Sequence, residues 1–199
     1  MKLFYSQNSP FARIARVALR ECELLKTVEE IEVINRSPDS PLLAYSPVCR
    51  VPTFVHDEFV LAETRTICSY FDQTNSDPIL FSSSNEGMKD KELETMALGF
   101  LEGIAAWVRE LRREPENQSL FLLDIEQQRA IRCLQYFEKK MKKMEIKADL
   151  SFQNIVLGCA LSLMDKRSLY GEWRVERPFT SKWFDDINGK KSMVDTAPI

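Results

Sequence analysis

The stretch Val51-Pro-Thr-Phe-Val-His-Asp-Glu-Phe-Val-Leu-Ala-Glu-Thr64 decides the fold of the first half of the chain. Residues 53–55 and 59–61 are β-formers separated by a short polar pair, which is the spacing of a β-hairpin. Pro52 opens the first strand, where proline is tolerated at an edge, at a strand start or in a cis bond. After the second strand the apolar residues fall at helical spacing, so a helix is expected to begin near Thr64.

Two features of this stretch could bind a ligand. A cis Val51-Pro52 bond would turn the backbone N–H and C=O of Val51 outward, where they could pair with an extended peptide. The N–H groups of Thr64 and Arg65 at the helix start would attract an anion, and the Thr64 hydroxyl adds a donor. Glu63 also has a purely structural explanation, because acidic residues suit the positive end of a helix dipole. From the residues alone, the structural explanation is favoured.

Composition excludes several classes of function. The 199 residues are 44% hydrophobic and 29% charged, which is ordinary for a globular protein. A formal charge of −3 gives no electrostatic reason to expect a nucleic acid or an anionic membrane as partner. No signal peptide and no apolar run long enough to cross a bilayer is seen, so we expect a cytoplasmic protein.

Cysteine and histidine usage points away from metal sites and from His-based catalysis. The odd number and wide spacing of the cysteines, without a C-x-x-C pair, indicate reduced thiols and argue against a disulfide framework or a zinc site. Of these thiols, Cys49 could be exposed near a ligand, because it lies three residues before Pro52. His56 is the single histidine and lies beside the predicted turn, so a catalytic Ser-His-Asp or Cys-His group is not expected. The five cysteines are Cys22, Cys49, Cys68, Cys133 and Cys159.

The amino-terminal segment predicts a strand over residues 2–6 and a helix from Ser9 to about Leu25. Ser9 suits the N-cap and Pro10 suits the first helical position, which explains both residues structurally. The same helix start could hold an anion, because the nearest free donors there are those of Ser9 and Phe11. A thiolate at this point would meet a hydroxyl, backbone donors and the positive dipole end, all of which lower a thiol pKa.

The remaining pattern completes a two-domain organisation. A strand over residues 31–34, parallel to the first, and an irregular loop from Asn35 to Pro47 give the order of a thioredoxin-like domain. We expect that domain over residues 1–76, a linker over 77–85 and an all-helical domain over 86–199. Three helices there carry apolar stripes. The expected stripe residues are Leu93, Met96, Ala97, Phe100, Leu101, Ile104, Trp107, Val108 and Leu111, then Ile131, Leu134, Phe137, Met141 and Met144, then Phe152, Ile155, Val156, Cys159 and Leu163.

Three short motifs stand in order along the chain: Ser9-Pro10-Phe11, Arg50-Val51-Pro52-Thr53-Phe54 and Leu61-Ala62-Glu63-Thr64. Together they resemble a soluble glutathione transferase of bacterial type, whose patterns are S/C-P-F/Y, K-V-P-x-L and L-x-E-S. The resemblance continues to the end of the chain. Residues 150–155 are similar to the capping box that opens a buried helix in the family's second domain, and the stretches around Trp183-Phe184 and Thr196-Ala197-Pro198 resemble its tail.

The chain departs from the family pattern at a few positions. Asn154 replaces the usual Asp of the capping box, Cys49 a common Gly and Arg50 a common Lys, and Lys190-Lys191 replaces the usual Arg-Pro. Asparagine can still accept a capping hydrogen bond, so we expect the helix after Ser151 to form.

The resemblance implies a role for each matching residue. Ser9 would donate a hydrogen bond to the glutathione sulfur and hold it as thiolate. Val51 would pair through its backbone with the cysteinyl part, next to a cis Pro52. Glu63 would meet the γ-glutamyl ammonium while Thr64 takes the γ-glutamyl carboxylate, and this charge pairing reverses the preference for a purely structural Glu63. The implied glutathione-binding residues are Ser9, Phe11, Arg50, Val51, Pro52, Glu63 and Thr64.

Serine at position 9 cannot form a mixed disulfide, so it points to transferase or glutathione peroxidase-like chemistry and away from thiol reduction. Tyr5 and Ser6 are nearby hydroxyls and remain rivals for the catalytic role. Trp107 could wall an apolar pocket for the second substrate, although core packing is favoured.

The implied function is that of a glutathione S-transferase: a homodimer that binds glutathione as co-substrate and activates its thiolate for attack on a small electrophile, without a metal and with a role in detoxification. Glutathione-dependent isomerisation or ether cleavage would use the same site. The alternative from another class is a non-catalytic interaction protein of the same fold, like the stringent-starvation proteins that bind RNA polymerase. Retention of Ser9, Val51, Glu63 and Thr64 favours the enzyme, because an interaction protein does not need them.

Overall fold

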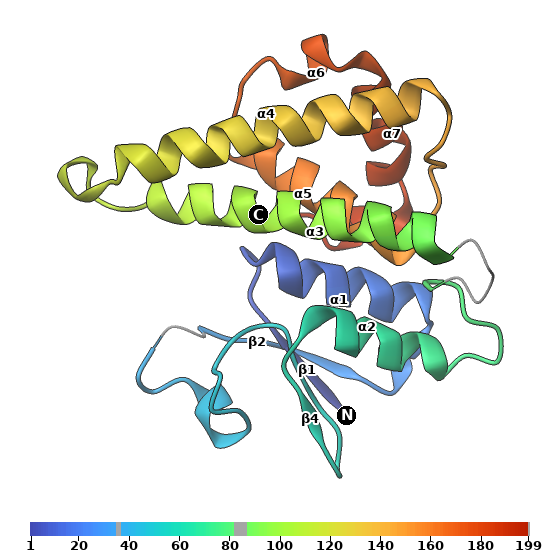
Figure 1. Cartoon of the computed structure of the whole chain (residues 1–199). Helices are drawn as coiled ribbons and strands as arrows, with labels where there is room; N and C mark the ends of the chain where they lie inside the picture. The colour runs from blue at the N-terminus through green and yellow to red at the C-terminus, as the bar shows by residue number, and fades with distance from the viewer. Residues whose placement is uncertain (35–36, 82–86, 199) are drawn as a thin grey trace.

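The computed structural model describes residues 1–34, 37–81 and 87–198, which form an amino-terminal α/β part and a carboxy-terminal helical part (Figure 1). Within these residues the first part carries a four-stranded sheet. Its two helices, α1 and α2, lie between the sheet and the helices of the second part (Figure 1). The expected thioredoxin-like domain followed by a helical bundle is confirmed.

The elements follow the expected order. Those of the first part are β1 (Lys2–Tyr5), α1 (Pro10–Glu21), η1 (Leu24–Lys26), β2 (Glu29–Glu32), η2 (Pro41–Ala44), β3 (Thr53–Val55), β4 (Val60–Leu61) and α2 (Thr64–Gln73). Those of the second part are α3 (Gly87–Glu110), η3 (Pro115–Asn117), α4 (Leu120–Lys142), α5 (Phe152–Lys166), α6 (Trp173–Glu176), α7 (Pro178–Asn188) and α8 (Lys191–Asp195).

The strand order in the sheet is β2-β1-β3-β4. β1 and β2 are parallel, whereas β1 pairs with β3 and β3 with β4 in antiparallel fashion. Because Phe4 lies opposite Thr53 and Phe54 opposite Leu61, the end of β1, the start of β3 and the end of β4 meet at one edge of the sheet. Alternate side chains serve opposite faces: Leu3 belongs to the main core under the helices, and Phe4 belongs to a small cluster on the other face.

Two elements of the first part, α1 and β2, differ from the sequence-based expectation by two or more residues at one or both ends. α1 ends at Glu21 instead of Leu25, because Glu23 adopts a left-handed conformation (φ 56°) and a 3₁₀ turn follows. The second strand covers 29–32 instead of 31–34. Pairing with β1 and a bridge from the Glu30 side chain to α1 outweigh the weak strand propensity of glutamate.

Three residues expected on the buried stripes of the helical part are exposed: Met96 at 44%, Leu111 at 45% and Met144 at 86%. The buried face of α3 is set by Ala97, Phe100, Leu101, Ile104, Trp107 and Val108. Met96 lies one residue, or about 100°, off that face, and the other two residues follow the ends of α3 and α4.

The helix α5 forms as expected, but its start is stabilised differently. Asn154 accepts no capping hydrogen bond; its Nδ2 donates to the Lys147 carbonyl at 2.9 Å and to Asp149 Oδ1 at 2.8 Å. The Ser151 N–H donates to the same Asp149 oxygen at 3.1 Å. The expected capping box is therefore wrong, because an acidic residue two positions upstream of Ser151 supplies the acceptor instead.

The segment that joins the two parts is hydrogen-bonded to both of them. The buried carboxylate of Asp72 on α2 accepts the N–H groups of Ile79, Leu80 and Phe81 at 2.8, 2.9 and 3.0 Å. The Leu80 carbonyl accepts the N–H of Phe152, the first residue of α5, at 2.9 Å. The rest of the predicted linker, from Ser82 to Asn85, the predicted helix start at Glu86 and the loop start at Asn35 lie outside the described residues.

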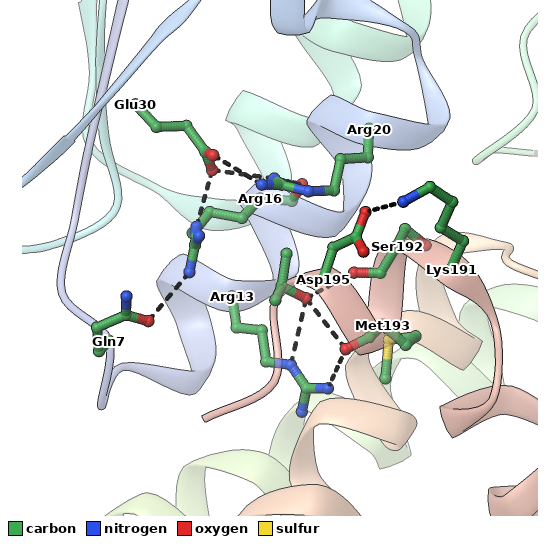
Figure 2. A network of polar contacts seen from close by, with 10 residues as sticks. Gln7, Arg13, Arg16, Arg20, Glu30, Lys191, Ser192, Met193 and Asp195 are labelled. Atoms are coloured by element: carbon green, nitrogen blue, oxygen red, sulfur yellow. Dashed lines mark hydrogen bonds and ion pairs between the residues drawn. The ribbon is translucent and has the colours of Figure 1, made fainter. Parts of the chain in front are cut away.

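Arginines of α1 connect this helix to the sheet and to the end of the chain (Figure 2). Arg13 donates from Nη2 to the Met193 carbonyl at 2.9 Å and from Nε to Thr196 Oγ1 at 3.5 Å, so it joins α1 to α8. On the sheet side, Arg16 and Arg20 each donate to the Glu30 carboxylate at 2.8 Å. Burial works to raise the pKa of Glu30, but the hydrogen bonds from Arg20 and Arg16 prevail and hold it below its usual value.

The Glu30→Gln substitution is expected to lower the free energy of unfolding by about 1–3 kcal/mol near neutral pH, because it replaces charge-assisted hydrogen bonds by neutral ones. Since the folded-state pKa of Glu30 is depressed, its contribution is fully present above the unfolded pKa of about 4.3 and disappears as the pH falls through the folded pKa. Urea denaturation of both proteins over a pH series measures this. Glu29→Gln, at an exposed neighbour, is the matched control, and an unfolding difference that persists at acid pH would contradict the assignment.

Candidate functional site

The residues singled out by the sequence gather at the edge of the sheet where β1 ends, β3 begins and β4 ends. Ser9 follows β1 and opens α1, Val51 immediately precedes the turn into β3, and Thr64 opens α2 just after β4. The hairpin turn with His56 lies at the opposite edge, where the imidazole stacks on Phe59 with ring centroids 4.8 Å apart. The topology alone therefore separates the candidate site from the single histidine.

Ser9 is the N-cap of α1, as expected, and remains able to donate. Its Oγ accepts the N–H of Ala12 at 3.2 Å, and its own N–H is held by the Ser6 carbonyl at 3.0 Å. A hydroxyl carries one hydrogen and two lone pairs, so the Ser9 O–H is still available to an anion. Within the described residues the Phe11 N–H makes no hydrogen bond, and Pro10 has none to offer. The first turn of α1 thus presents one hydroxyl and one N–H beside a positive dipole end.

The hydroxyls of Tyr5 and Ser6, the rivals of Ser9 for the catalytic role, lie in different environments from that of Ser9. The Tyr5 ring faces the Arg16 guanidinium, whose central carbon is 4.0 Å from the ring centroid. Ser6 uses its carbonyl to accept the Ser9 N–H. Neither hydroxyl stands at a helix N-terminus, so Ser9 has the stronger electrostatic surroundings for a thiolate.

Val51 presents unpaired backbone groups. The Val51-Pro52 bond is cis, as the sequence suggested. The Val51 side chain packs against the small cluster of Phe4, Val33 and Leu42, whereas its N–H and C=O form no hydrogen bond in the described part of the chain. Arg50 next to it is exposed. This arrangement leaves a strand-like edge to which an extended peptide can pair.

The start of α2 differs from the expectation in one respect. Glu63 is the N-cap, and its carboxylate folds back to accept the N–H of Arg65 at 2.8 Å and that of Thr66 at 2.7 Å. The Arg65 N–H is therefore not a free donor, because Glu63 occupies it. The N–H and the hydroxyl of Thr64, which is 6% exposed, form no hydrogen bond among the described residues and remain available.

Residues 8–74 match the family described as the glutathione S-transferase N-terminal domain. Over 201 residues the chain is 25% identical to the uncharacterized GST-like protein YibF of Escherichia coli strain K12, and the match covers 100% of this chain and 98% of that protein. The part of the chain from residue 8 to residue 74 is a glutathione S-transferase N-terminal domain.

Solved structures of glutathione S-transferase family proteins share the fold over the whole chain. A glutathione transferase family member from Pseudomonas fluorescens Pf-5, with bound S-(propanoic acid)-glutathione, is 27% identical, covers 100% of both chains and gives a TM-score of 0.85. The same family member with bound glutathione gives 0.88. A glutathione S-transferase from Methylobacillus flagellatus with glutathione bound is 24% identical, covers 100% of this chain and 99% of that chain, and gives 0.89.

Other groups singled out by the sequence have structural roles. Trp107 is 7% exposed and packs in the main core, which is the reading the sequence favoured. None of the five cysteines forms a disulfide. Burial raises the pKa of the Cys159 thiol to about 11 and that of Cys22 to about 12, so both remain protonated near neutral pH. Neither thiol is a nucleophile under those conditions.

Two cavities lie away from the candidate site. One of about 560 Å³ is lined by the segments 78–81 and 145–154, and another of about 460 Å³ surrounds the hairpin turn. Ser9, Val51, Glu63 and Thr64 line neither. In the described ranges no group of histidine, cysteine, aspartate and glutamate side chains could hold a metal ion. No helix there is long and apolar enough to span a membrane.

The sequence reasoning missed one residue at this edge. Arg167, directly after α5, donates from Nη2 to the Asn8 Oδ1 at 3.2 Å, and Asn8 precedes Ser9 in the chain. No motif marks Arg167, and 159 positions separate the two partners. Only the packing of α5 against α1 brings the arginine to the loop that carries Ser9.

Proposed function

We propose that the protein is a glutathione S-transferase, which binds glutathione at the edge formed by β1, β3 and β4 and activates its thiolate for attack on a small electrophile. The observation that carries the proposal is the start of α1, where the Ser9 hydroxyl and the Phe11 N–H are both free to donate. Glutathione bound to a relative of 27% identity supports the choice of ligand.

Glutathione would use each group that the edge leaves unpaired. The Ser9 hydroxyl donates to the sulfur, and the backbone of Val51 pairs with the cysteinyl residue in the manner of an added strand. The N–H and hydroxyl of Thr64 take the γ-glutamyl carboxylate at the positive end of α2. Glu63 takes the ammonium; its carboxylate offers about four lone-pair directions, and Arg65 and Thr66 occupy three of them. Phe11 and Arg50 flank the tripeptide.

Catalysis would follow from lowering the pKa of the bound thiol. The Ser9 O–H, the Phe11 N–H and the dipole of α1 all stabilise a negative sulfur more than a neutral one. The thiol proton leaves to solvent, the thiolate pair forms a carbon–sulfur bond, and the electrophile releases its leaving group with the pair of the broken bond. Donors that are in place before the reaction lower the barrier without reorganisation.

Titration calorimetry with glutathione tests the binding site. Glu63→Ala would also remove the N-cap of α2, so Glu63→Ser is the sharper variant: serine still caps a helix but carries no charge for the ammonium. We expect Glu63→Ser and Thr64→Val each to weaken glutathione binding about tenfold or more, which is the loss of one charge-assisted hydrogen bond.

Glu58→Ser, on the exposed hairpin turn, removes the same charge away from the site and is expected to bind like the wild type. An unchanged affinity in both Glu63→Ser and Thr64→Val would refute the assignment of these residues. Absence of any binding at millimolar glutathione, with an unchanged melting temperature, would refute the enzyme proposal itself.

The proposal includes a two-fold symmetric homodimer that acts in detoxification in the cytoplasm. Symmetric dimers are the commonest oligomers of soluble proteins. The absence of disulfides among the five cysteines agrees with a reducing compartment.

A second candidate is a non-catalytic interaction protein of the same fold. Exposed apolar side chains favour it: Leu120 is 79% exposed, Phe121 75% and Leu111 45%, all at the projecting end of the α3–α4 hairpin (Figure 1). Such side chains on a surface often mark a contact with another protein. The glutathione titration separates the two candidates, because only the enzyme needs the glutathione site that includes Ser9.

A further inference from the structure

A cation of the helical part lies beside the loop that carries Ser9. The Arg167 guanidinium is exposed and donates from Nη2 to Asn8 Oδ1 at 3.2 Å. Asn8 is itself exposed and stands one residue before Ser9. The guanidinium is therefore held at the amino-terminal end of α1, the end at which the glutathione sulfur would lie.

The backbone fixes the position of Arg167. It is the C-cap of α5, and the following Ser168 adopts a left-handed conformation (φ 49°). The N–H of Ser168 donates to the Asp165 carbonyl at 3.1 Å, and that of the buried Leu169 donates to the Met164 carbonyl at 3.0 Å. These two bonds are those of a Schellman motif. Arg167 thus leaves the helix from a fixed point rather than from a variable loop.

Among the described residues, none neutralises the charge of Arg167. Within residues 1–34, 37–81 and 87–198 no carboxylate lies within ion-pair distance of it. The nearest acid in sequence, Asp165, is already paired with Arg174 at 2.6 Å. The Asn8 amide oxygen takes one of the five N–H donors of the guanidinium, which leaves the others for an external anion.

We propose that Arg167 is a specificity-determining residue that selects electrophiles carrying a carboxylate. This inference rests on the proposed function, since it assigns a substrate class to the same site. The planar fork of arginine matches a carboxylate, and a group held at the Ser9 end of α1 meets the part of the conjugate attached to sulfur rather than the tripeptide. The site would accordingly favour small acids with a carbon open to thiolate attack over neutral analogues of the same shape.

Two glutathione conjugates of nearly the same shape, one charged and one neutral at the added group, test the inference: S-(carboxymethyl)glutathione and S-(carbamoylmethyl)glutathione. We expect calorimetry to show that the wild type binds the carboxylate conjugate about fivefold or more tightly than its amide. Arg167→Gln should abolish this preference while binding glutathione itself as the wild type does. In the wild type the preference should also shrink between low and high salt, because exposed charges are screened.

Arg132→Gln, at an exposed position of α4, changes the net charge equally and should keep the preference. Equal binding of both conjugates by the wild type, a preference that survives in Arg167→Gln, or a preference insensitive to salt would each overturn the inference while leaving glutathione binding intact. Loss of binding of glutathione itself by the wild type would instead refute the proposed function, and this inference with it.

Discussion

Replacing Asp72 by alanine is expected to lower the free energy of unfolding by about 3–5 kcal/mol. The Asp72 side chain is 1% exposed and accepts the three consecutive N–H groups of residues 79–81. Alanine leaves these donors without a partner, and a buried unsatisfied donor such as the Leu80 N–H costs about 1–3 kcal/mol. The part-buried N–H groups of Ile79 and Phe81 add smaller losses. Urea denaturation at neutral pH measures the difference.

Two further variants make this result interpretable. Asp77→Ala lies in the same connecting segment at an exposed position and should change stability by less than about 0.5 kcal/mol. Asp72→Asn keeps one oxygen acceptor and should fall between alanine and the wild type. If the free energy of unfolding of Asp72→Ala lies within about 1 kcal/mol of the wild-type value, water satisfies the N–H groups of residues 79–81 and the Asp72 carboxylate contributes little to stability.

The second large effect is expected at Ser9. If Ser9 holds the glutathione thiolate, its removal should lower kcat/KM for a model electrophile by about 10²–10³, the usual loss for one preorganised donor to a developing or bound anion. The pKa of the bound thiol should rise, which the ultraviolet absorbance of the thiolate follows across a pH series. The affinity for glutathione should change little, because Val51, Glu63 and Thr64 would still bind the rest of the tripeptide.

The choice of variant matters because Ser9 also caps α1. Ser9→Ala would cost about 1 kcal/mol of stability through the lost cap, whereas Ser9→Gly costs only a few tenths. Loss of activity in both variants, with a normal melting temperature in Ser9→Gly, assigns the effect to the hydroxyl. Tyr5→Phe and Ser6→Ala are the matched controls. Loss of activity in either control, with activity retained in Ser9→Gly, would transfer the catalytic role to that hydroxyl.

Local rules predicted the parts of the site that depend on neighbouring residues. Serine followed by proline before an apolar helical pattern indicated the start of α1, and that start is observed at Pro10 with Ser9 as its cap. The polar pair between two short β-formers indicated the hairpin of β3 and β4, whose strands pair as expected. In both cases the interacting residues lie within a few positions of each other, so a short stretch of sequence contains all of them.

The features that the sequence did not reveal depend on residues that compete for the same hydrogen bond or on residues far apart in the sequence. Serine and aspartate lead the usual caps, so the residues alone indicate neither that Glu63 is the N-cap of α2 nor that its carboxylate occupies the Arg65 N–H. Asn154 lost its capping role to Asp149, a rival that the motif does not include. The pairing of Arg167 with Asn8 requires α1 and α5 to pack first, and no local pattern encodes that.

The contacts of Arg13 set an order of events during synthesis. This arginine is synthesised before the helical part, yet its hydrogen-bond acceptors are the Met193 carbonyl and the Thr196 hydroxyl, 180 and 183 positions later. A guanidinium that is 4% exposed in the finished fold cannot be buried favourably before those acceptors have emerged. The face of α1 that carries Arg13 therefore stays uncovered until residues 193–196 have been synthesised. A chain released before that point keeps this face exposed to chaperones and proteases.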